Sequence, residues 1–307
     1  MVNKKLYQSH DKMAKTLFSD RENAADYLKA TLPKNIQQKL LWESLALENN
    51  SYIDSKLTEN FSDIVYSCDF NTKYGLLPIK VSFLFEHKSQ YAPYIHLQLL
   101  QYKLNIWFEN INQEQRPQIV IPLVFYHGQE KWLKRSLSSY FSDTPGVLKD
   151  LEIFIPEFDY LLTDLSQFTN EQIKDQLFDR VIVKTTMLIM KNIYNQQSIE
   201  QNLIDFLALS EQYFATDRGL DFLQAIILYL FNQTKINRDN IVEDIKKISG
   251  EGARMAQSTA ENLIEQGLEQ GEKRKALDSA RRMKKKGLDI QLIHEVTGLP
   301  IEEIEQL

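Results

Sequence analysis

Residues 76–88 read Leu-Leu-Pro-Ile-Lys-Val-Ser-Phe-Leu-Phe-Glu-His-Lys, and this segment predicts a β-strand that ends in charged residues. Short runs rich in Ile, Val and Phe are typical of β-strands. Side chains alternate between the two faces of a strand, so Glu86 and Lys88 point one way and His87 points the other. Charges are seldom buried without partners, so an acid and a lysine at the end of an apolar strand mark a candidate site.

A second acid, Asp63, lies in the preceding apolar run, Phe61–Phe70. If the two strands pair antiparallel, the start of one lies beside the end of the other, and Asp63 converges with Glu86. Two carboxylates suit Mg²⁺, which commonly takes one or two carboxylates plus a substrate phosphate. The backbone carbonyl of His87 could add a third oxygen. Lys88 would then stabilise a scissile phosphate or help to activate a metal-bound water.

The rest of the chain supplies the other elements of an α/β fold. Residues 1–32 predict a helix that ends before Pro33, and apolar runs at 51–57 and 118–126 predict two more strands. Apolar positions between 93 and 107 follow a helical period. The order of helix, three strands, helix and strand predicts a mixed four-stranded sheet flanked by helices.

Three parts are expected along the chain. Residues 1–135 form the sheet-containing core, and 136–250 form a helical region with apolar-periodic segments at 179–190, 199–207 and 220–231. Residues 251–307 form a basic helix, which Gly287 ends, and a terminal helical hairpin at 290–296 and 301–307.

Composition excludes several classes of protein. Among 307 residues, 43% are apolar and 25% are charged, which is typical of a globular chain and not of a disordered or fibrous one. The single cysteine, Cys68, cannot form an internal disulfide or supply a zinc or iron–sulfur site alone, so we expect a reducing cytoplasm. No secretory signal is visible, and the longest apolar stretch, 225–231, is far below the roughly 20 residues of a membrane helix, so we expect no membrane association.

These residues resemble a known superfamily. Asp63, Glu86-x-Lys88 and the helix that follows resemble the PD-(D/E)XK nucleases, and Gln98-Leu-Leu-Gln-Tyr102 matches the Gln-x-x-x-Tyr motif of RecB-like members. More narrowly, the chain resembles the Rpn family of recombination-promoting nucleases, often described as transposases. The matching segments span nearly the whole chain and include His10-Asp11 and residues 61–66, 84–89, 99–102, 121–128 and 297–304. Family members often have Gln where Lys88 stands and Arg where Gln98 stands.

The resemblance implies a restriction-endonuclease-like core and cleavage of DNA phosphodiesters that depends on Mg²⁺, or on Mn²⁺ in its place. Asp63 and Glu86 would be metal ligands, and Lys88 would orient water or neutralise developing charge. Gln98 and Tyr102 would be supporting catalytic residues near the phosphate or Lys88. The implied protein is a DNA endonuclease of low sequence specificity that acts in recombination or on mobile elements.

Simpler interpretations stand beside these. Asp63, Glu86 and Lys88 could form a structural ion cluster at a sheet edge, where charges also deter aggregation. Gln98 and Tyr102 could be ordinary helix-face residues with the tyrosine packed. We expect His87 to be packed or hydrogen-bonded and Cys68 to be a small buried side chain. We expect His10 and Asp11 to cap or start a helix. We expect His96 and His127 to be surface or loop groups.

The stretch 273–286 contains eight basic residues and one acidic residue, although the whole chain has a net charge of −6. Such a helix could follow a phosphate backbone, with the candidate DNA contacts Lys273, Arg274, Lys275, Arg281, Arg282, Lys284, Lys285 and Lys286. The alternative is a solvated helix face or an arm for homo-oligomerisation. Two functional hypotheses differ in chemistry: an Mg²⁺-dependent endonuclease, and a non-enzymatic nucleic-acid-binding or assembly protein on a decayed nuclease fold. A toxin-like or phage-defence nuclease would share the chemistry of the first and differ only in its biological role.

Overall fold

The computed structural model describes residues 2–48, 64–71, 79–142, 144, 146 and 149–307. The chain divides into two compact units, an N-terminal unit of residues 1–252 and a C-terminal unit of residues 253–307. Asp63 and the predicted strand at 51–57 lie outside the described residues.

Within the described residues, one sheet of five strands lies at the centre of the N-terminal unit, in the order β1-β2-β3-β4-β5. The strands are β1 (Leu40–Leu47), β2 (Ile64–Phe70), β3 (Ile79–Lys88), β4 (Ile119–Tyr126) and β5 (Leu161–Asp164). The pairs β1–β2 and β2–β3 are antiparallel, whereas β3–β4 and β4–β5 are parallel. The predicted mixed sheet is confirmed, but the expected count of four strands is wrong. The four residues of β5 are too few to show a clear period in the sequence.

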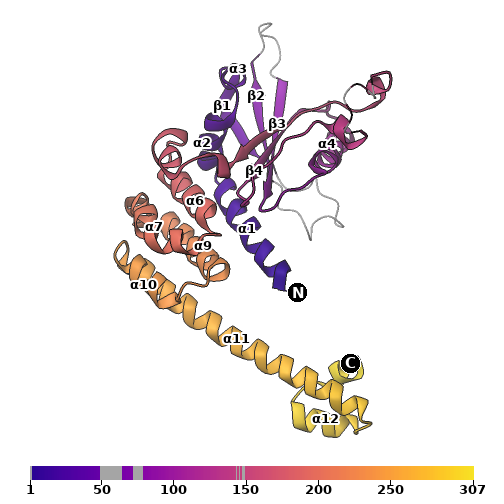
Figure 1. Ribbon diagram of the computed structural model, residues 1–307, viewed down its shortest axis with the longest axis vertical. Coiled ribbons are helices and arrows are strands. Elements are labelled where there is room, and N and C mark those ends of the chain that lie inside the picture. The colour runs from indigo at the N-terminus through magenta and orange to yellow at the C-terminus, as the bar shows by residue number, and fades with distance from the viewer. Residues whose placement is uncertain (1, 49–63, 72–78, 143, 145, 147–148) are drawn as a thin grey trace. The chain divides into compact units, whose positions relative to one another are not determined.

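Helices cover the two faces of this sheet (Figure 1). On one face, Phe85 of β3 contacts Phe18 of α1 (Val2–Phe18) and Tyr27 of α2 (Arg21–Thr31), with ring centroids 5.0 and 5.7 Å apart. On the other face, α4 (Ile95–Asn112) packs Leu99 into an apolar cluster with Val65 and Val124. Because helices cover both faces, Glu86 and its neighbour His87 enter different layers of the fold.

The predicted helix at 1–32 is in fact two helices, because the sequence contains an internal start signal. The Asp20 side chain accepts hydrogen bonds from the backbone N–H groups of Glu22 and Asn23, at 2.9 and 3.0 Å, and so caps α2. Pro33 ends that segment as expected and stands at the N-cap of the short helix α3 (Lys34–Gln37).

The predicted helical region, 136–250, is not helical throughout, because it includes β5; its apolar-periodic segments at 179–190, 199–207 and 220–231 correspond to helices. It contains α5 (Asn170–Gln172), α6 (Val181–Asn192), α7 (Gln196–Ala208), α8 (Glu211–Phe214), α9 (Asp217–Gln233) and α10 (Arg238–Lys246). Between β4 and α6 lie three 3₁₀ turns, at Leu137–Tyr140, Glu152–Phe154 and Leu165–Gln167, and a π turn at Ile173–Leu177. Asp26 of α2 ties this region to the first helices, since its carboxylate accepts bonds from the N–H groups of Asp179 and Arg180, both at 3.0 Å.

The C-terminal unit contains most of α11 (Gly250–Lys285) and all of α12 (Ile290–Thr297) and α13 (Ile301–Glu305). A small core of Ala280, Ile293, Leu299 and Ile304 holds the three helices together. Gly298 ends α12 at a φ of +69°, a left-handed conformation that favours glycine. The predicted terminal hairpin is therefore confirmed. Among the described residues, no helix has the length and apolarity needed to cross a membrane.

Candidate active site

Glu86 and Lys88 lie at the carboxyl end of β3, the central strand of the sheet. Their parallel partners in β4 are Val124 and Tyr126. The Glu86 side chain is buried, and its Oε1 lies 2.5 Å from Nζ of Lys88. The buried carboxylate is thus neutralised by an ammonium that is itself partly exposed, and such pairing is the usual condition for burying a charge.

Gln98 and Tyr102, one turn apart on α4, complete the cluster around Glu86. The Gln98 amide donates to Oε1 of Glu86 at 3.0 Å and to the Tyr102 hydroxyl at 2.8 Å. Tyr102 is buried and belongs to the apolar cluster that joins α4 to the sheet. The structure therefore brings together four of the predicted site residues: Glu86, Lys88, Gln98 and Tyr102.

The position of Asp63, the fifth predicted residue, lies outside the described residues, so its distance to Glu86 stays a prediction. The next residue, Ile64, pairs antiparallel with Phe85, which precedes Glu86. The antiparallel pairing on which the prediction rested is therefore present. Within the described part of the chain, no group of three or more His, Cys, Asp or Glu side chains is arranged to hold a metal ion.

The opposite face of the same strand end carries a histidine cluster, consisting of His10, His87 and His127. The ring centroid of His127 lies 4.8 Å from the ring centroid of His10 and 5.0 Å from that of His87. Nδ1 of His87 is hydrogen-bonded to Asp11 at 2.7 Å, and Nδ1 of His127 is 3.1 Å from the carbonyl of Met190. Among the described residues, the buried Nε2 atoms of His87 and His127 have no hydrogen-bond partner.

Burial controls the protonation of His10 and His127. It lowers the pKa of His10 to about 3, an effect that the nearby His87 strengthens and that Asp11 opposes. Burial also lowers the pKa of His127 well below its usual value, and the other two histidines act in the same direction. These two imidazoles are therefore neutral at pH 7, and His10 accepts or donates a 2.8 Å hydrogen bond with the Tyr229 hydroxyl.

The structure agrees with some of the expectations about individual residues and contradicts others. His87 is hydrogen-bonded and Cys68 is buried, as predicted. His10 and Asp11 lie inside α1 and do not start it, and His96 is buried inside α4, so those predictions are wrong. His127 lies in the loop after β4, as predicted, but its side chain is buried. The strand alternation holds the signal that could have found the cluster: His87 and His127 follow Phe85 and Phe125 by two residues, and those strands are paired.

The predicted DNA contacts lie on α11, with Lys286 just beyond its end. Three of them are held within the C-terminal unit. Lys273 pairs with Glu303 at 3.0 Å, Arg281 lies 3.9 Å from Asp278, and Lys284 donates to two backbone carbonyls of α13, at 3.0 and 2.8 Å. Part of the basic run therefore stabilises the hairpin.

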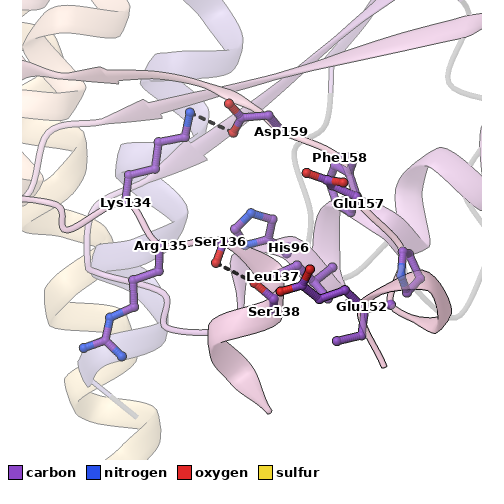
Figure 2. A pocket seen from close by; sticks show the side chains of 12 residues that line it. His96, Lys134, Arg135, Ser136, Leu137, Ser138, Glu152, Glu157, Phe158 and Asp159 are labelled. Carbon is purple, nitrogen blue, oxygen red and sulfur yellow. Dashed lines mark hydrogen bonds and ion pairs between the residues drawn. The ribbon is translucent and has the colours of Figure 1, made fainter. Parts of the chain in front are cut away.

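A cavity of about 610 Å³ opens beside the start of α4 (Figure 2). His96, Ser136 and Phe158 contribute to its wall, together with an ion pair of Lys134 and Asp159 that joins their side chains at 2.8 Å. None of the predicted site residues that the structure describes lines this cavity. It is therefore separate from the cluster around Glu86.

Comparison with known proteins shows the class of protein to which this fold and cluster belong. The family model described as "Putative transposase, YhgA-like" matches residues 8–220. The chain is 27% identical over 308 residues to the recombination-promoting nuclease RpnA of Escherichia coli (strain K12), covering 99% of this chain and 98% of that protein. No solved structure matches.

Two further relatives differ in their described activity. The recombination-promoting nuclease RpnD of Escherichia coli O157:H7 is 29% identical over 121 residues, covering 39% of this chain and 45% of that protein. The inactive recombination-promoting nuclease-like protein RpnE of Escherichia coli (strain K12) is 24% identical over 302 residues, covering 96% of each chain. The chain belongs to the YhgA-like transposase family, and its resemblance to the Rpn proteins is confirmed.

Proposed function

We propose that this protein is a metal-dependent DNA endonuclease of the Rpn type, acting in recombination or on mobile elements. The observation that carries the proposal is the buried carboxylate of Glu86, held by Lys88 and Gln98 at the end of the central strand. The nuclease names of the relatives support the same assignment.

The donor set suits a hard cation such as Mg²⁺ or Mn²⁺. Both contacts to Glu86 within the described residues go to Oε1, so we assign Oε2 to the metal. Asp63 and the backbone carbonyl of His87 are the further oxygens that we propose. The bound ion would supply Lewis-acid activation of water and of the phosphate.

The protein's own groups have separate roles in this proposal. Lys88 is partly exposed at the mouth of the cluster, so its ammonium is placed to neutralise charge that develops on the phosphate. Gln98 fixes the orientation of the Glu86 carboxylate, and the hydrogen bond to Tyr102 fixes Gln98 in turn. DNA is the proposed substrate, and the exposed residues of 273–286 are the proposed contacts to its backbone.

Plasmid cleavage in Mg²⁺ and in EDTA tests this function. We expect Glu86→Gln and Lys88→Ala to reduce nicking to the background level, and Gln98→Ala to slow it about 10- to 100-fold. The matched control is Glu211→Gln, the same change at an exposed acid at the start of α8. Cleavage retained by the Glu86 variant, or undiminished in EDTA, would refute the proposal.

A second function has its own support, because RpnE, which matches 96% of this chain, is described as inactive. In that case the chain would bind nucleic acid without cutting it. The full-length protein would then bind DNA in a filter or gel assay, show no cleavage with either metal, and lose binding when the basic residues of 273–286 are neutralised.

A further inference from the structure

Helix α4 is apolar on both of its long faces. Its inner face packs Ile95, Leu99, Tyr102 and Ile106 against the sheet. Its outer face carries Tyr94, at the N-cap, followed by Leu97, Leu104, Phe108 and Ile111, whose exposed fractions lie between 40% and 63%. We call these five residues the α4 stripe. An exposed apolar patch of this kind on a protein surface marks an interaction site, so the stripe needs a cover.

The spacing of the stripe is that of a coiled-coil seam. Leu97, Leu104 and Ile111 follow one another at intervals of seven residues and so occupy one of the two seam positions of a heptad. Gln101 and Phe108 occupy the other seam position, between them. At 100° per residue, this seam lies opposite the inner face of the helix. Such a seam fits a second helix, because a partner helix places its own side chains into the holes of a heptad pattern.

Charge decides what kind of partner fits. The structure describes every residue of α4, and the only charged ones are Lys103 and Glu109, which lie outside the seam. The Lys103 ammonium stacks over the rings of Trp107 and Phe158, with its Nζ 5.3 and 4.4 Å from their centroids. Nucleic acid and anionic lipid both require cations on the contact surface, so neither suits the stripe.

We propose that the α4 stripe pairs antiparallel with the α4 stripe of a second copy of this chain. An uncharged seam meets its own copy without like-charge repulsion. The stripe is also symmetric about a point between residues 102 and 103, so a two-fold axis there pairs Tyr94 with Ile111 and Leu97 with Phe108 of the other copy. Gln101 lies next to this axis, where a single polar residue fixes the register of two helices.

The size of the surface sets the strength of the pairing. If each of the five side chains loses roughly 100 Å² of exposed surface, the two copies bury about 1,000 Å², the lower limit for a specific interface. The dimer should therefore dissociate at concentrations on the order of micromolar. This inference does not depend on nuclease activity, although the inner face of the same helix holds Gln98 and Tyr102 in the candidate site.

Sedimentation velocity over about 1 to 100 µM tests the pairing. We expect the full-length protein to shift from monomer to dimer, and Leu104→Glu, next to the axis, to stay monomeric, a weakening of at least about 100-fold. The matched control is Leu268→Glu, the same change at an exposed apolar residue of α11, which should dimerise like the unaltered protein. Unchanged circular dichroism would show that both variants fold.

A monomer at every concentration would overturn the proposal, and so would a dimer that Leu104→Glu leaves intact. Loss of the dimer with Leu268→Glu alone would place the contact on α11 and would also overturn it. Cysteine cross-linking with a short bis-maleimide tests the direction, since the single native thiol, Cys68, is buried. Antiparallel pairing predicts that Gln101→Cys cross-links and that Tyr94→Cys does not; equal cross-linking of both would refute it.

Discussion

Lowering the pH from about 7.5 to about 5 is expected to destabilise the N-terminal unit through the histidine cluster. The pKa of His10 is 6.5 in the unfolded chain and about 3 in the folded protein, so the unfolded state binds more protons between these values. The stability that neutral His10 contributes is complete above pH 6.5 and is lost as the pH falls toward 3. Between pH 7.5 and pH 5, the protonation of one such histidine in the unfolded state lowers the free energy of unfolding by about 2 kcal/mol. His127 lowers it further, in the same direction.

Urea unfolding followed by tryptophan fluorescence measures this effect. All three tryptophans, Trp42, Trp107 and Trp132, lie in the N-terminal unit, so the signal reports on the unit that holds the cluster. The informative variant is His10→Gln, whose free energy of unfolding should change by about 2 kcal/mol less between the two pH values than that of the unaltered protein. This difference is independent of how much the variant is destabilised at pH 7.5.

The control is His294→Gln, because His294 belongs to the C-terminal unit, where its Nδ1 is hydrogen-bonded to the carbonyl of Leu299. It should keep the pH dependence of the unaltered protein. If His10→Gln also keeps the full pH dependence, His10 does not titrate far below its usual range, and the argument from burial is wrong.

Three further predictions follow from single contacts. Asp11→Ala removes the hydrogen bond that holds His87 and is expected to slow plasmid cleavage about tenfold without weakening DNA binding in a gel-shift assay; an unchanged rate would show that the contact does not position the strand end. Leu99→Ala removes a fully buried side chain from the cluster beneath α4 and should lower the free energy of urea unfolding by about 2–5 kcal/mol; a loss below 1 kcal/mol would contradict this packing. Asp20→Ala removes the cap of α2 and should cost about 1 kcal/mol in the same assay, with Asp20→Asn as the variant expected to retain most of it.

The sequence was informative where apolar periodicity was long. The strands that contain Val65, Phe85 and Val124 and the helix that contains Leu99 were all predicted, because alternation and helical spacing are local properties of the chain. The split between α1 and α2 was missed although Asp20 is a recognisable cap, since the apolar residues on either side suggested one helix. Strand β1 was missed because Leu40–Leu47 does not alternate cleanly: its burial pattern is interrupted where the ladder with β2 shifts register.

For the candidate site, the sequence predicted the residue types and the structure supplied the contacts. The contact of Gln98 with Glu86 joins a helix to a strand, and nothing in the spacing of the two residues fixes its 3.0 Å distance. The burial of His96 and His127 could not be predicted from composition, because it depends on tertiary neighbours such as Tyr140 and Met190. The types of residue in a candidate site can be predicted from a sequence, whereas the burial of a side chain depends on the assembled fold.

At the end of β3, two consecutive residues face the two different helical layers: Glu86 faces α4 and His87 faces α1. A deletion of one residue between Phe83 and Glu86 would reverse this assignment, placing an imidazole under α4 and a carboxylate among the histidines. The position of each residue along β3, which sets the face of the sheet that its side chain occupies, is therefore constrained as well as its identity. Insertions and deletions in this segment should be tolerated only in pairs.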